Sequence, residues 1–293
     1  MPASVDAAPG GPGSGQQRSG TLYLIATPIG NLGDITLRSL ETLRQVSAVV
    51  CEDSRRTRIL LTAHGIQARL LSFPAFDERR RVDDILRRLE GGDSLALCSD
   101  AGSTSISDPG QALVAGAIAR GIPVTSLPGP SVVLPALQLS GLDSDRFLFV
   151  GFLPRKGGSR RAALEELRAS PATLVLFESP RRLGPTLAEL AVALGDRRAA
   201  VARELTKIHE EVVRGRLSEL AERFAAGTLG EVTLVIEGAP PVIPEATEPL
   251  DDAIRRLGQE GLRTREIARQ LATERGLSAR AIYARVLELV LDR

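Results

Sequence analysis

The chain has 293 residues, of which 43% are hydrophobic and 25% charged, and its formal net charge is +1. These values are typical of a soluble globular protein of about two domains, and the small charge argues against a broadly basic nucleic-acid binder. Aromatic residues make up only 3% of the chain. A base-stacking platform for single-stranded nucleic acid is therefore not expected to be its main device.

Cysteine and histidine are scarce, with two of each. Their wide separation leaves no recognisable zinc spacing and no Ser-His-Asp pattern, so no metal is expected. Cys51 and Cys98 each lie in or beside an apolar run, which predicts buried free thiols in a reducing compartment. Residues 1–19 are rich in Gly, Ser, Pro and Ala and predict a disordered tail rather than a signal peptide. No apolar run approaches the ~18 residues of a membrane span, so a cytoplasmic protein without a membrane partner is expected.

Residues 20–138 are expected to form an α/β domain with a parallel sheet. Its buried strands are predicted from short apolar runs at 21–26, 48–51, 70–73, 94–98 and 124–127. Helical periodicity follows Asp34, a possible cap, and returns at 77–88 and 112–119. Because every connection is long enough for a right-handed crossover, the strands should be parallel. Three loops that contain glycine and proline, at 27–33, 99–110 and 128–131, then gather at one sheet edge.

The stretch from Cys98 to Gly110 reads CSDAGSTSISDPG and is the strongest single site candidate. Its small residues let backbone amides approach a ligand at the carboxyl end of a strand, where open α/β sheets place their sites. Asp100 and Asp108 flank this approach, and Asp108 with Pro109 also suits the start of a helix. An ordinary βα loop with a capped helix is the alternative interpretation.

A second site candidate, Glu52-Asp53-Ser54-Arg55, follows the strand at 48–51. Its alternative interpretation is a helix N-terminus, which favours acidic residues.

Residues 139–239 are expected to form a second α/β domain with a mixed sheet. Its strands are predicted at 146–151, 173–177, 199–203 and 231–237, with a helix at about 161–168. The segment 240–250 is rich in proline and predicts a linker. Beyond it, three helices at 251–257, 264–274 and 278–291 predict a small helical unit within 251–293 that has features of a helix-turn-helix. DNA reading is one interpretation of this unit, and two packed helices with no nucleic-acid role is the other.

Seven motifs, taken in order, resemble a known family. They are LYLIATPIGNLGDIT (22–36), CEDSRRT (51–57), SDAGSTSISDPG (99–110), PGPS (128–131), GFLPRK (151–156), FESPRRL (177–183) and RELTK (203–207). Together they resemble the ribosomal RNA small subunit methyltransferase I family of the tetrapyrrole methylase superfamily, over about residues 21–240 and with the trailing helical unit included. The resemblance implies two α/β domains of tetrapyrrole methylase type, with S-adenosylmethionine in the cleft between them. It further implies 2'-O-methylation of a cytidine ribose in the decoding region of 16S rRNA, and a homodimer.

The resemblance also implies which residues hold the methyl donor. In the first domain they are Pro28, Ile29, Gly30, Asp100, Gly102, Ser103, Ser131 and Val132. In the second domain they are Phe177, Glu204, Leu205, Glu231, Val232 and Thr233. An adenine needs apolar walls, and a sulfonium cation tolerates nearby carboxylates, so such a pocket is chemically reasonable.

A ribose hydroxyl is a poor nucleophile and benefits from a group that accepts or polarises its proton. Lys207 with Glu204 is one candidate pair, and Asp53 beside Arg55 is another. The alternative for the first pair is a structural ion network that also includes Arg203. Because backbone charge supplies affinity and register, a set of cationic residues is expected to contact RNA phosphates. The set comprises Arg55, Arg155, Lys156, Arg160, Arg181 and Arg182.

The chain departs from the family pattern in three places. Ser54 stands where the family usually has Thr, Ser103-Thr104 stands for Thr-Pro, and Phe76-Asp77-Glu78 stands for His-Asn-Glu. Loss of the proline would loosen the donor loop.

Two other functions stay open. A small-molecule tetrapyrrole methyltransferase is one, although the RELTK and EDSR motifs favour the RNA branch. A DNA-binding regulator that uses residues 251–291 is the other. A P-loop nucleotide hydrolase is disfavoured, because no GxxxxGK[ST] motif occurs.

Overall fold

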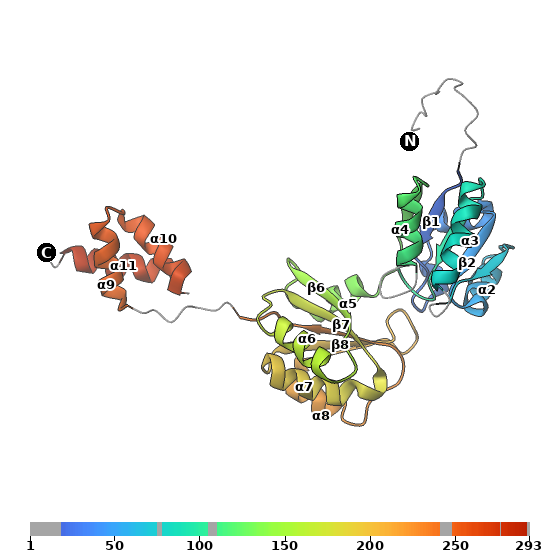
Figure 1. Cartoon of the computed structure of the whole chain (residues 1–293). Coiled ribbons are helices and arrows are strands. Elements are labelled where there is room, and N and C mark those ends of the chain that lie inside the picture. The colour runs from blue at the N-terminus through green and yellow to red at the C-terminus, as the bar shows by residue number, and fades with distance from the viewer. Residues whose placement is uncertain (1–18, 75–77, 105–109, 241–247, 276, 292–293) are drawn as a thin grey trace, which may run out of the picture. The chain divides into compact units, whose positions relative to one another are not determined.

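The computed structural model describes residues 19–74, 78–104, 110–240, 248–275 and 277–291 (Figure 1). The predictions for the N-terminal tail, Phe76, Asp77, Asp108, Pro109 and most of the linker lie outside the described residues. The chain divides into two compact units, residues 1–238 and 239–293. Among the described helices, none is both long enough and apolar enough to cross a bilayer.

The first sheet of the larger unit is parallel throughout, as predicted. Its strands are β1 (Leu22–Ile25), β2 (Ala48–Cys51), β3 (Leu70–Ser72), β4 (Leu95–Cys98) and β5 (Val124–Leu127). The order is β3-β2-β4-β1-β5, so β1 lies between β4 and β5. Continuous apolar runs form the three central strands β2, β4 and β1, because helices cover both faces of a parallel sheet, whereas the edge strands β3 and β5 include polar residues. Cys51 and Cys98 are buried at neighbouring strand ends and form no disulfide, which confirms the prediction of buried free thiols.

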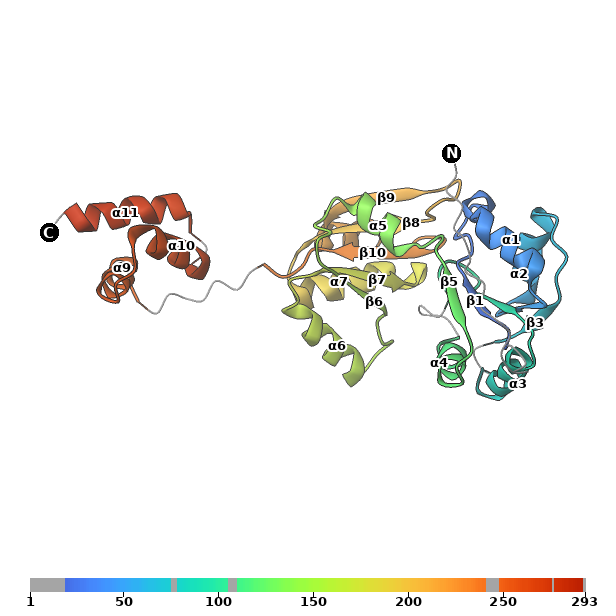
Figure 2. The ribbon, with the colours of Figure 1, turned by 90° about the horizontal axis from the view of Figure 1, so that it is seen from above.

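Helices cover the two faces of this sheet in pairs. They are α1 (Leu37–Gln45), α2 (Ser54–Ala63), α3 (Glu78–Glu90) and α4 (Gln111–Ala119). Figure 2 shows α1 and α2 on one side of the sheet and α3 and α4 on the other. One core gathers around Leu43 and Leu60, and the other around Leu89 and Leu113.

Two local predictions for this part of the chain need correction. Asp34 does not cap α1, because it lies in a 3-10 turn (Leu32–Asp34) and the side chain of Thr36 caps the helix instead. The start of helix α2 was considered as the alternative interpretation of residues 52–55, but its extent was not predicted, although it buries Thr57, Leu60 and Leu61 at helical spacing.

The second sheet is mixed, which confirms the prediction. Its strands are β6 (Phe147–Phe152), β7 (Thr173–Glu178), β8 (Arg198–Arg203), β9 (Glu211–Arg216) and β10 (Val232–Ile236). The order is β6-β7-β10-β8-β9, with β6 and β7 parallel and the other pairs antiparallel. Strand β9 was not predicted. It is an edge strand whose sequence EVVRGR carries little apolar signal.

Helices α6 (Gly158–Arg168), α7 (Leu183–Leu194) and α8 (Leu217–Arg223) share the largest apolar core of this sheet. Helix α5 (Val133–Ser140) instead joins a separate core, in which Ala136 and Leu137 are buried with Val175 and Val235 of the second sheet. The boundary expected after residue 138 therefore falls inside a helix that packs on the second sheet. We call β1–β5 with α1–α4 the first lobe, and α5 through β10 the second lobe.

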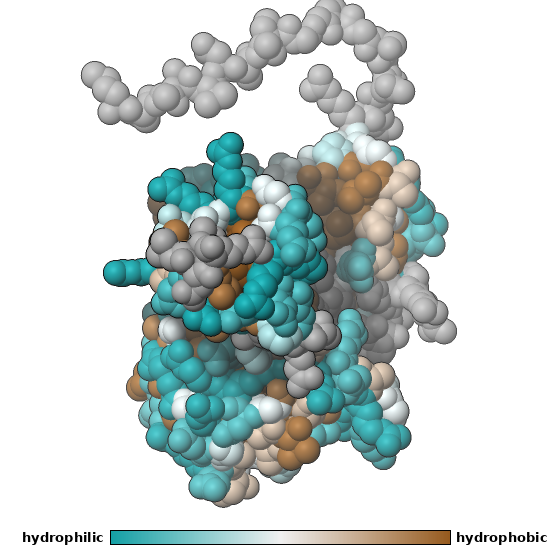
Figure 3. Space-filling model, turned by 90° about the vertical axis from the view of Figure 1, so that its left-hand side faces the viewer, coloured by the Kyte–Doolittle hydropathy of each residue, from teal (hydrophilic) through white to brown (hydrophobic). Residues whose placement is uncertain are grey.

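The smaller unit consists, in its described part, of helices α9 (Leu250–Gln259), α10 (Thr264–Arg275) and α11 (Ala279–Leu291). These closely match the three predicted helical segments. Leu257, Leu271 and Val286 are buried together at their centre. The guanidinium of Arg285 donates to both carboxylate oxygens of Asp251, at 2.9 and 2.6 Å, and ties α11 to α9. The face of the molecule in Figure 3 is mainly hydrophilic, with apolar side chains in separate patches, as expected of a globular protein.

Candidate active site

The loops that follow β1, β4 and β5 meet at the carboxyl edge of the first sheet. Thr27 and Gly102 exchange two backbone hydrogen bonds of 2.9 Å, which join the first two loops. The hydroxyl of Thr27 also donates to the carbonyl of Ser99 at 3.0 Å. The third loop passes close to β1, because a side chain at Gly129 would lie 3.0 Å from the Cβ of Ala26. For their described residues, the predicted gathering of these loops is confirmed.

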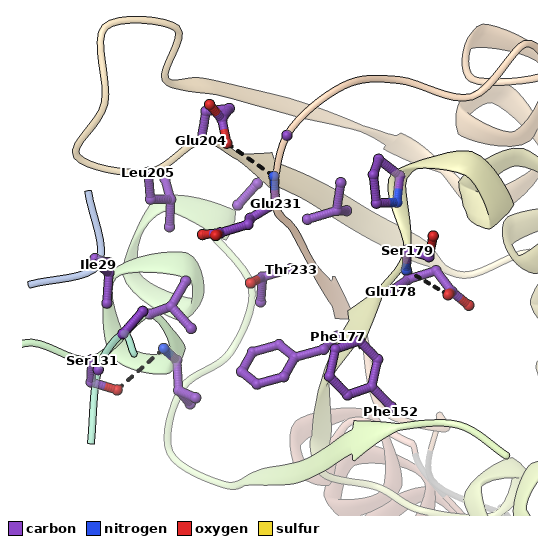
Figure 4. Close-up of a pocket in the computed structure, with 18 of the residues that line it drawn as sticks. Ile29, Ser131, Phe152, Phe177, Glu178, Ser179, Glu204, Leu205, Glu231 and Thr233 are labelled. Carbon is purple, nitrogen blue, oxygen red and sulfur yellow. Dashed lines mark hydrogen bonds between the residues drawn. The ribbon is translucent and has the colours of Figure 1, made fainter. Parts of the chain in front are cut away.

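A cavity of about 470 Å³ lies between these loops and the second lobe (Figure 4). Many residues that the resemblance implied line it, namely Ile29, Gly102, Ser103, Ser131, Val132, Phe177, Glu204, Leu205, Glu231, Val232 and Thr233. Others line it that were not predicted, namely Ala101, Val133, Phe152, Glu178, Ser179, Pro180, Ala202 and Gly230. Pro28, Gly30, Asp53, Asp100 and Lys207 are not among the described lining residues.

One end of the cavity is apolar. The ring of Phe177 packs edge-to-face on Phe152, with centroids 5.4 Å apart, and on Phe149, with centroids 5.1 Å apart. Figure 4 shows the Phe177 ring reaching toward the cavity below Thr233, which is itself buried. An apolar cavity with a few well-placed polar groups is typical of small-molecule sites.

The other end carries charge. The Nζ of Lys207 lies 2.9 Å from Oε1 of Glu204 and 3.3 Å from Oε2 of Glu231. The same Glu204 oxygen accepts a hydrogen bond from the backbone amide of Glu231 at 2.9 Å. Arg203 is not part of this cluster's hydrogen bonding, because its guanidinium donates to Glu211 instead. The ion network considered from the sequence is therefore present for Glu204 and Lys207, with Glu231 as its third member.

The backbone around this cluster is unusual. Glu204 and Thr206 have φ values of 51° and 66°, in the left-handed region that non-glycine residues rarely adopt. Gly230, with φ of 87°, leaves room for the Glu204 carboxylate, since a Cβ there would lie 2.3 Å from its carboxyl carbon. Such strained positions are found at functional sites more often than elsewhere.

The two partners of the ion pair are both charged at neutral pH. Burial alone would lower the pKa of Lys207, but its hydrogen bond to Glu204 and the charge of Glu231 raise that pKa overall. The hydrogen bond from Lys207 holds the pKa of Glu204 below its ordinary value of 4.5, and the amide of Glu231 adds to this effect. Lys207 is thus an ammonium that donates, and Glu204 is a carboxylate that accepts.

The acids at the ends of β2 and β4 have different partners. Asp100 accepts from the backbone amide of Asp53 at 3.1 Å and lies 3.6 Å from the Arg56 guanidinium. Asp53 caps α2, and hydrogen bonds from the side chain and backbone of Arg55 lower its pKa to about 2. The interpretation of Asp53 as a residue at a helix N-terminus is confirmed. A carboxylate of such low pKa is a weak proton acceptor.

The cationic candidates fall into two groups. Arg55, Arg155, Lys156 and Arg181 are exposed, and Arg182 is half-buried. Arg160 is only 7% exposed. Its guanidinium donates to Glu189, to the carbonyl of Pro154 and to Thr186, at 2.8, 2.9 and 3.3 Å. Arg160 therefore has no free face for an RNA phosphate, and we withdraw it from the candidates.

The comparisons with known proteins agree on one family. A sequence model of the tetrapyrrole (corrin/porphyrin) methylases matches residues 21–221. "Ribosomal RNA small subunit methyltransferase I" of Mesorhizobium japonicum is 46% identical over 92% of both chains. The protein of that name from Thermotoga maritima is 44% identical and is covered over 99% of its length by 75% of this chain.

Solved structures share the fold. Uroporphyrin-III C-methyltransferase of Thermus thermophilus, complexed with S-adenyl homocysteine, has a TM-score of 0.55 at 20% identity, over 74% of this chain and 97% of its own. Cobalt precorrin-4 methyltransferase has a TM-score of 0.56 at 18% identity, and the match covers 74% of this chain and 94% of that enzyme. Because the family model matches residues 21–221 and the relatives are 41–46% identical over most of the chain, this chain belongs to the tetrapyrrole methylase family, in its group of ribosomal RNA small subunit methyltransferases I.

Proposed function

We propose that this chain transfers a methyl group from S-adenosylmethionine to the ribose 2'-oxygen of a cytidine in the decoding region of 16S rRNA. The observation that carries the proposal is the cavity between the lobes, with an aromatic wall at one end and two carboxylates at the other. The names of the relatives at 41–46% identity support ribosomal RNA as the substrate class.

The residues of the cavity fit this donor. Its volume of about 470 Å³ lies within the range of about 300–1,000 Å³ that is usual for small-molecule sites. Phe177, Val232 and Thr233 offer an apolar wall with a hydroxyl, which suits an adenine. Glu204, Glu231 and Lys207 together carry one net negative charge, which attracts a sulfonium. When bound, the donor supplies an electrophilic methyl group.

The chain's own residues must align the acceptor oxygen with the methyl group and accept the proton that this oxygen loses. Methyl transfer is an in-line displacement, so alignment accounts for much of the rate. The Glu204 carboxylate is held by two donors, Lys207 Nζ and the Glu231 amide, and keeps lone pairs free to accept a proton. In this proposal Glu204 accepts the hydroxyl proton and Lys207 fixes the carboxylate. Asp53 has no part in it, because Arg55 binds both of its carboxylate oxygens and the residue does not line the cavity, whereas the donors to Glu204 bind Oε1 alone.

The exposed cations Arg55, Arg155, Lys156 and Arg181 would contact RNA phosphates, together with Arg182. A homodimer and a cytoplasmic location are also part of the proposal. Exposed Leu134 and Leu139 on α5 supply apolar surface for such a dimer.

The test is labelled-methyl transfer to small ribosomal subunits from a strain that lacks this gene, followed by mapping of the modified nucleotide. We expect transfer to one cytidine 2'-oxygen in the decoding region. Label on a base, or no label, would contradict the proposal. A parallel assay with uroporphyrinogen tests the small-molecule alternative, for which we expect no transfer.

A further inference from the structure

A second cavity, of about 540 Å³, adjoins the candidate active site. It is lined by Phe152, Leu153, Arg155, Ser179 and Arg182. Phe152 and Ser179 also line the first cavity, so the two cavities share a wall. Donor binding in the first cavity leaves the second one without an assigned ligand, and a ligand there would lie beside the aromatic end of the donor cavity.

The shared wall carries an exposed aromatic ring. Phe152 ends β6 and is 59% exposed, which is unusual for a phenylalanine. It is paired with Phe177 of β7 in the sheet register, and the two rings pack edge-to-face at 63°. Figure 4 shows the two rings side by side. An exposed ring held in place by a second ring is a suitable platform for stacking an unpaired RNA base.

Arg182 is held at this cavity by a buried acid. The side chain of Glu178 is only 2% exposed, and its Oε1 accepts from Nε and Nη2 of Arg182 at 3.0 and 2.5 Å. Glu178 is fixed in turn by the amide of Ser179 at 2.6 Å and the hydroxyl of Thr186 at 2.7 Å. The Nη1 group of Arg182 makes no hydrogen bond to a described residue. One edge of the guanidinium is therefore fixed while the other is free to donate to a ligand.

Arg155 adds a second cation. It is exposed and forms no ion pair with any residue that the structure describes. The described lining of the second cavity contains no carboxylate. Since Glu178 balances the charge of Arg182, Arg155 leaves the cavity with one net positive charge, which matches a phosphodiester. Ser179 offers a hydroxyl at the border of the two cavities.

We propose that the second cavity receives an unpaired nucleotide of the RNA that flanks the target, with its base on Phe152 and a phosphate on Arg155 and Arg182. Holding the flanking nucleotide there fixes the strand beside the donor cavity and leaves the target ribose free to reach its charged end at Glu204. This inference rests on the proposed function and deepens it. An aromatic platform beside a fixed guanidinium and a free one fits a nucleotide better than a free anion, which needs no ring.

The test compares variants of the two arginines with a matched control. Arg155→Gln and Arg182→Gln remove residues that line only the second cavity, and Arg168→Gln removes an exposed arginine at the far end of α6. We expect unchanged calorimetric affinity for S-adenosylmethionine in Arg155→Gln and Arg168→Gln, and the affinity of Arg182→Gln is measured as well because Arg182 pairs with Glu178 of the donor cavity. For small subunits from the strain lacking this gene, we expect kcat/KM to fall about tenfold in each of the two cavity variants. The control should keep the wild-type value.

The aromatic platform is tested by Phe152→Leu, with Phe147→Leu on the same strand as the control. Loss of stacking should lower kcat/KM for subunits by about fivefold to a hundredfold, and the control should not change. Arg182→Lys keeps the charge without the fork, so it should recover only part of the loss seen with glutamine. Circular dichroism unfolding of every variant checks that the fold is kept.

The outcomes separate the two proposals. If the wild type neither binds the donor nor methylates subunits, the proposed function fails. If the wild type does both, while Arg155→Gln, Arg182→Gln and Phe152→Leu all keep wild-type kcat/KM, the second cavity is not the nucleotide site and the proposed function stands.

Discussion

The side chain of Lys207 runs directly across the α-carbon of Gly30. A Cβ at Gly30 would lie 2.4 Å from Cγ of Lys207 and 2.7 Å from Oγ1 of Thr206. The missing side chain thus lets a loop of the first lobe lie against the RELTK segment of the second. Gly30 does not line the cavity, but its lack of a side chain makes room for Lys207. The loop that carries it holds the lysine in place.

Replacing Gly30 with alanine should therefore disturb the site. Overpacking at such a contact costs about 1–3 kcal/mol, so we expect kcat/KM for small subunits to fall about tenfold or more. The matched control is Gly158→Ala, because a Cβ at Gly158 would meet no atom within 4 Å. Equal activity of the two variants would show that Lys207 adjusts to the added methyl group at no cost.

Removing the lysine should separate donor binding from chemistry. Lys207→Ala leaves Glu204 without one of its two fixed donors, so we expect kcat to fall about a hundredfold. Donor affinity, measured by calorimetry, should be retained. His209→Ala, an exposed neighbour, should behave as the wild type. Normal turnover by the lysine variant would remove this residue from the mechanism.

The ion pair also predicts a dependence of stability on pH. Because the pKa of Glu204 is lower in the folded chain than its ordinary value of 4.5, its charge stabilises the fold above pH 4.5. That contribution is lost as the pH falls through the lowered folded pKa. Urea unfolding of the wild type and Glu204→Gln should show a difference in unfolding free energy that is constant near neutral pH and shrinks below pH 4.5. A difference that does not change with pH would mean that the carboxylate charge contributes nothing.

Substitutions of Arg160 and Arg155 should affect different properties, namely the stability of the fold and the binding of RNA. Arg160→Gln breaks three hydrogen bonds of a buried guanidinium, so we expect the free energy of unfolding to fall by about 2–3 kcal/mol. Arg155→Gln should leave it unchanged and weaken the salt dependence of RNA binding instead. Denaturant titrations and filter binding at several salt concentrations make the comparison. A loss of salt dependence in a fully folded Arg160 variant would restore that residue as a phosphate contact.

A shortened chain tests the role of the helical unit. All described residues that line the two cavities lie between positions 29 and 233, within the compact unit that ends at Gly238. A chain ending at Gly238 should therefore fold, bind the donor with wild-type affinity and still methylate subunits. DNA binding by residues 239–293 alone, together with loss of methylation in the shortened chain, would favour a DNA-binding regulator.

Sequence patterns predicted elements well where burial is complete. The central strands β1, β2 and β4 are continuous apolar runs because both faces of the sheet are covered, and all five strands were predicted. Helix α7 was missed although Leu183, Leu187, Leu190 and Leu194 lie at helical spacing. Strand β9 lies at a sheet edge and alternates only weakly, so its pattern is close to that of a loop.

The site could be predicted only in part from the sequence. The motifs gave residues on both walls of the first cavity, but the strand predicted at 146–151 stops one residue short of Phe152, which lines the cavity. Its role depends on the parallel register of β6 with β7, which sets it beside Phe177. Arg160 was read as a surface cation, because nothing in a linear run of arginines tells which one faces Glu189 and Thr186. Both facts depend on tertiary packing rather than on local pattern.

In the proposed arrangement, Phe152 contacts the ligands of both cavities, so a substitution at this position affects both. A substitution there that suits another nucleotide would also reshape the chamber of the methyl donor. A change of target would therefore have to arise at positions such as Arg155, which line the second cavity alone. Position 152 should tolerate few substitutions for as long as both ligands are used.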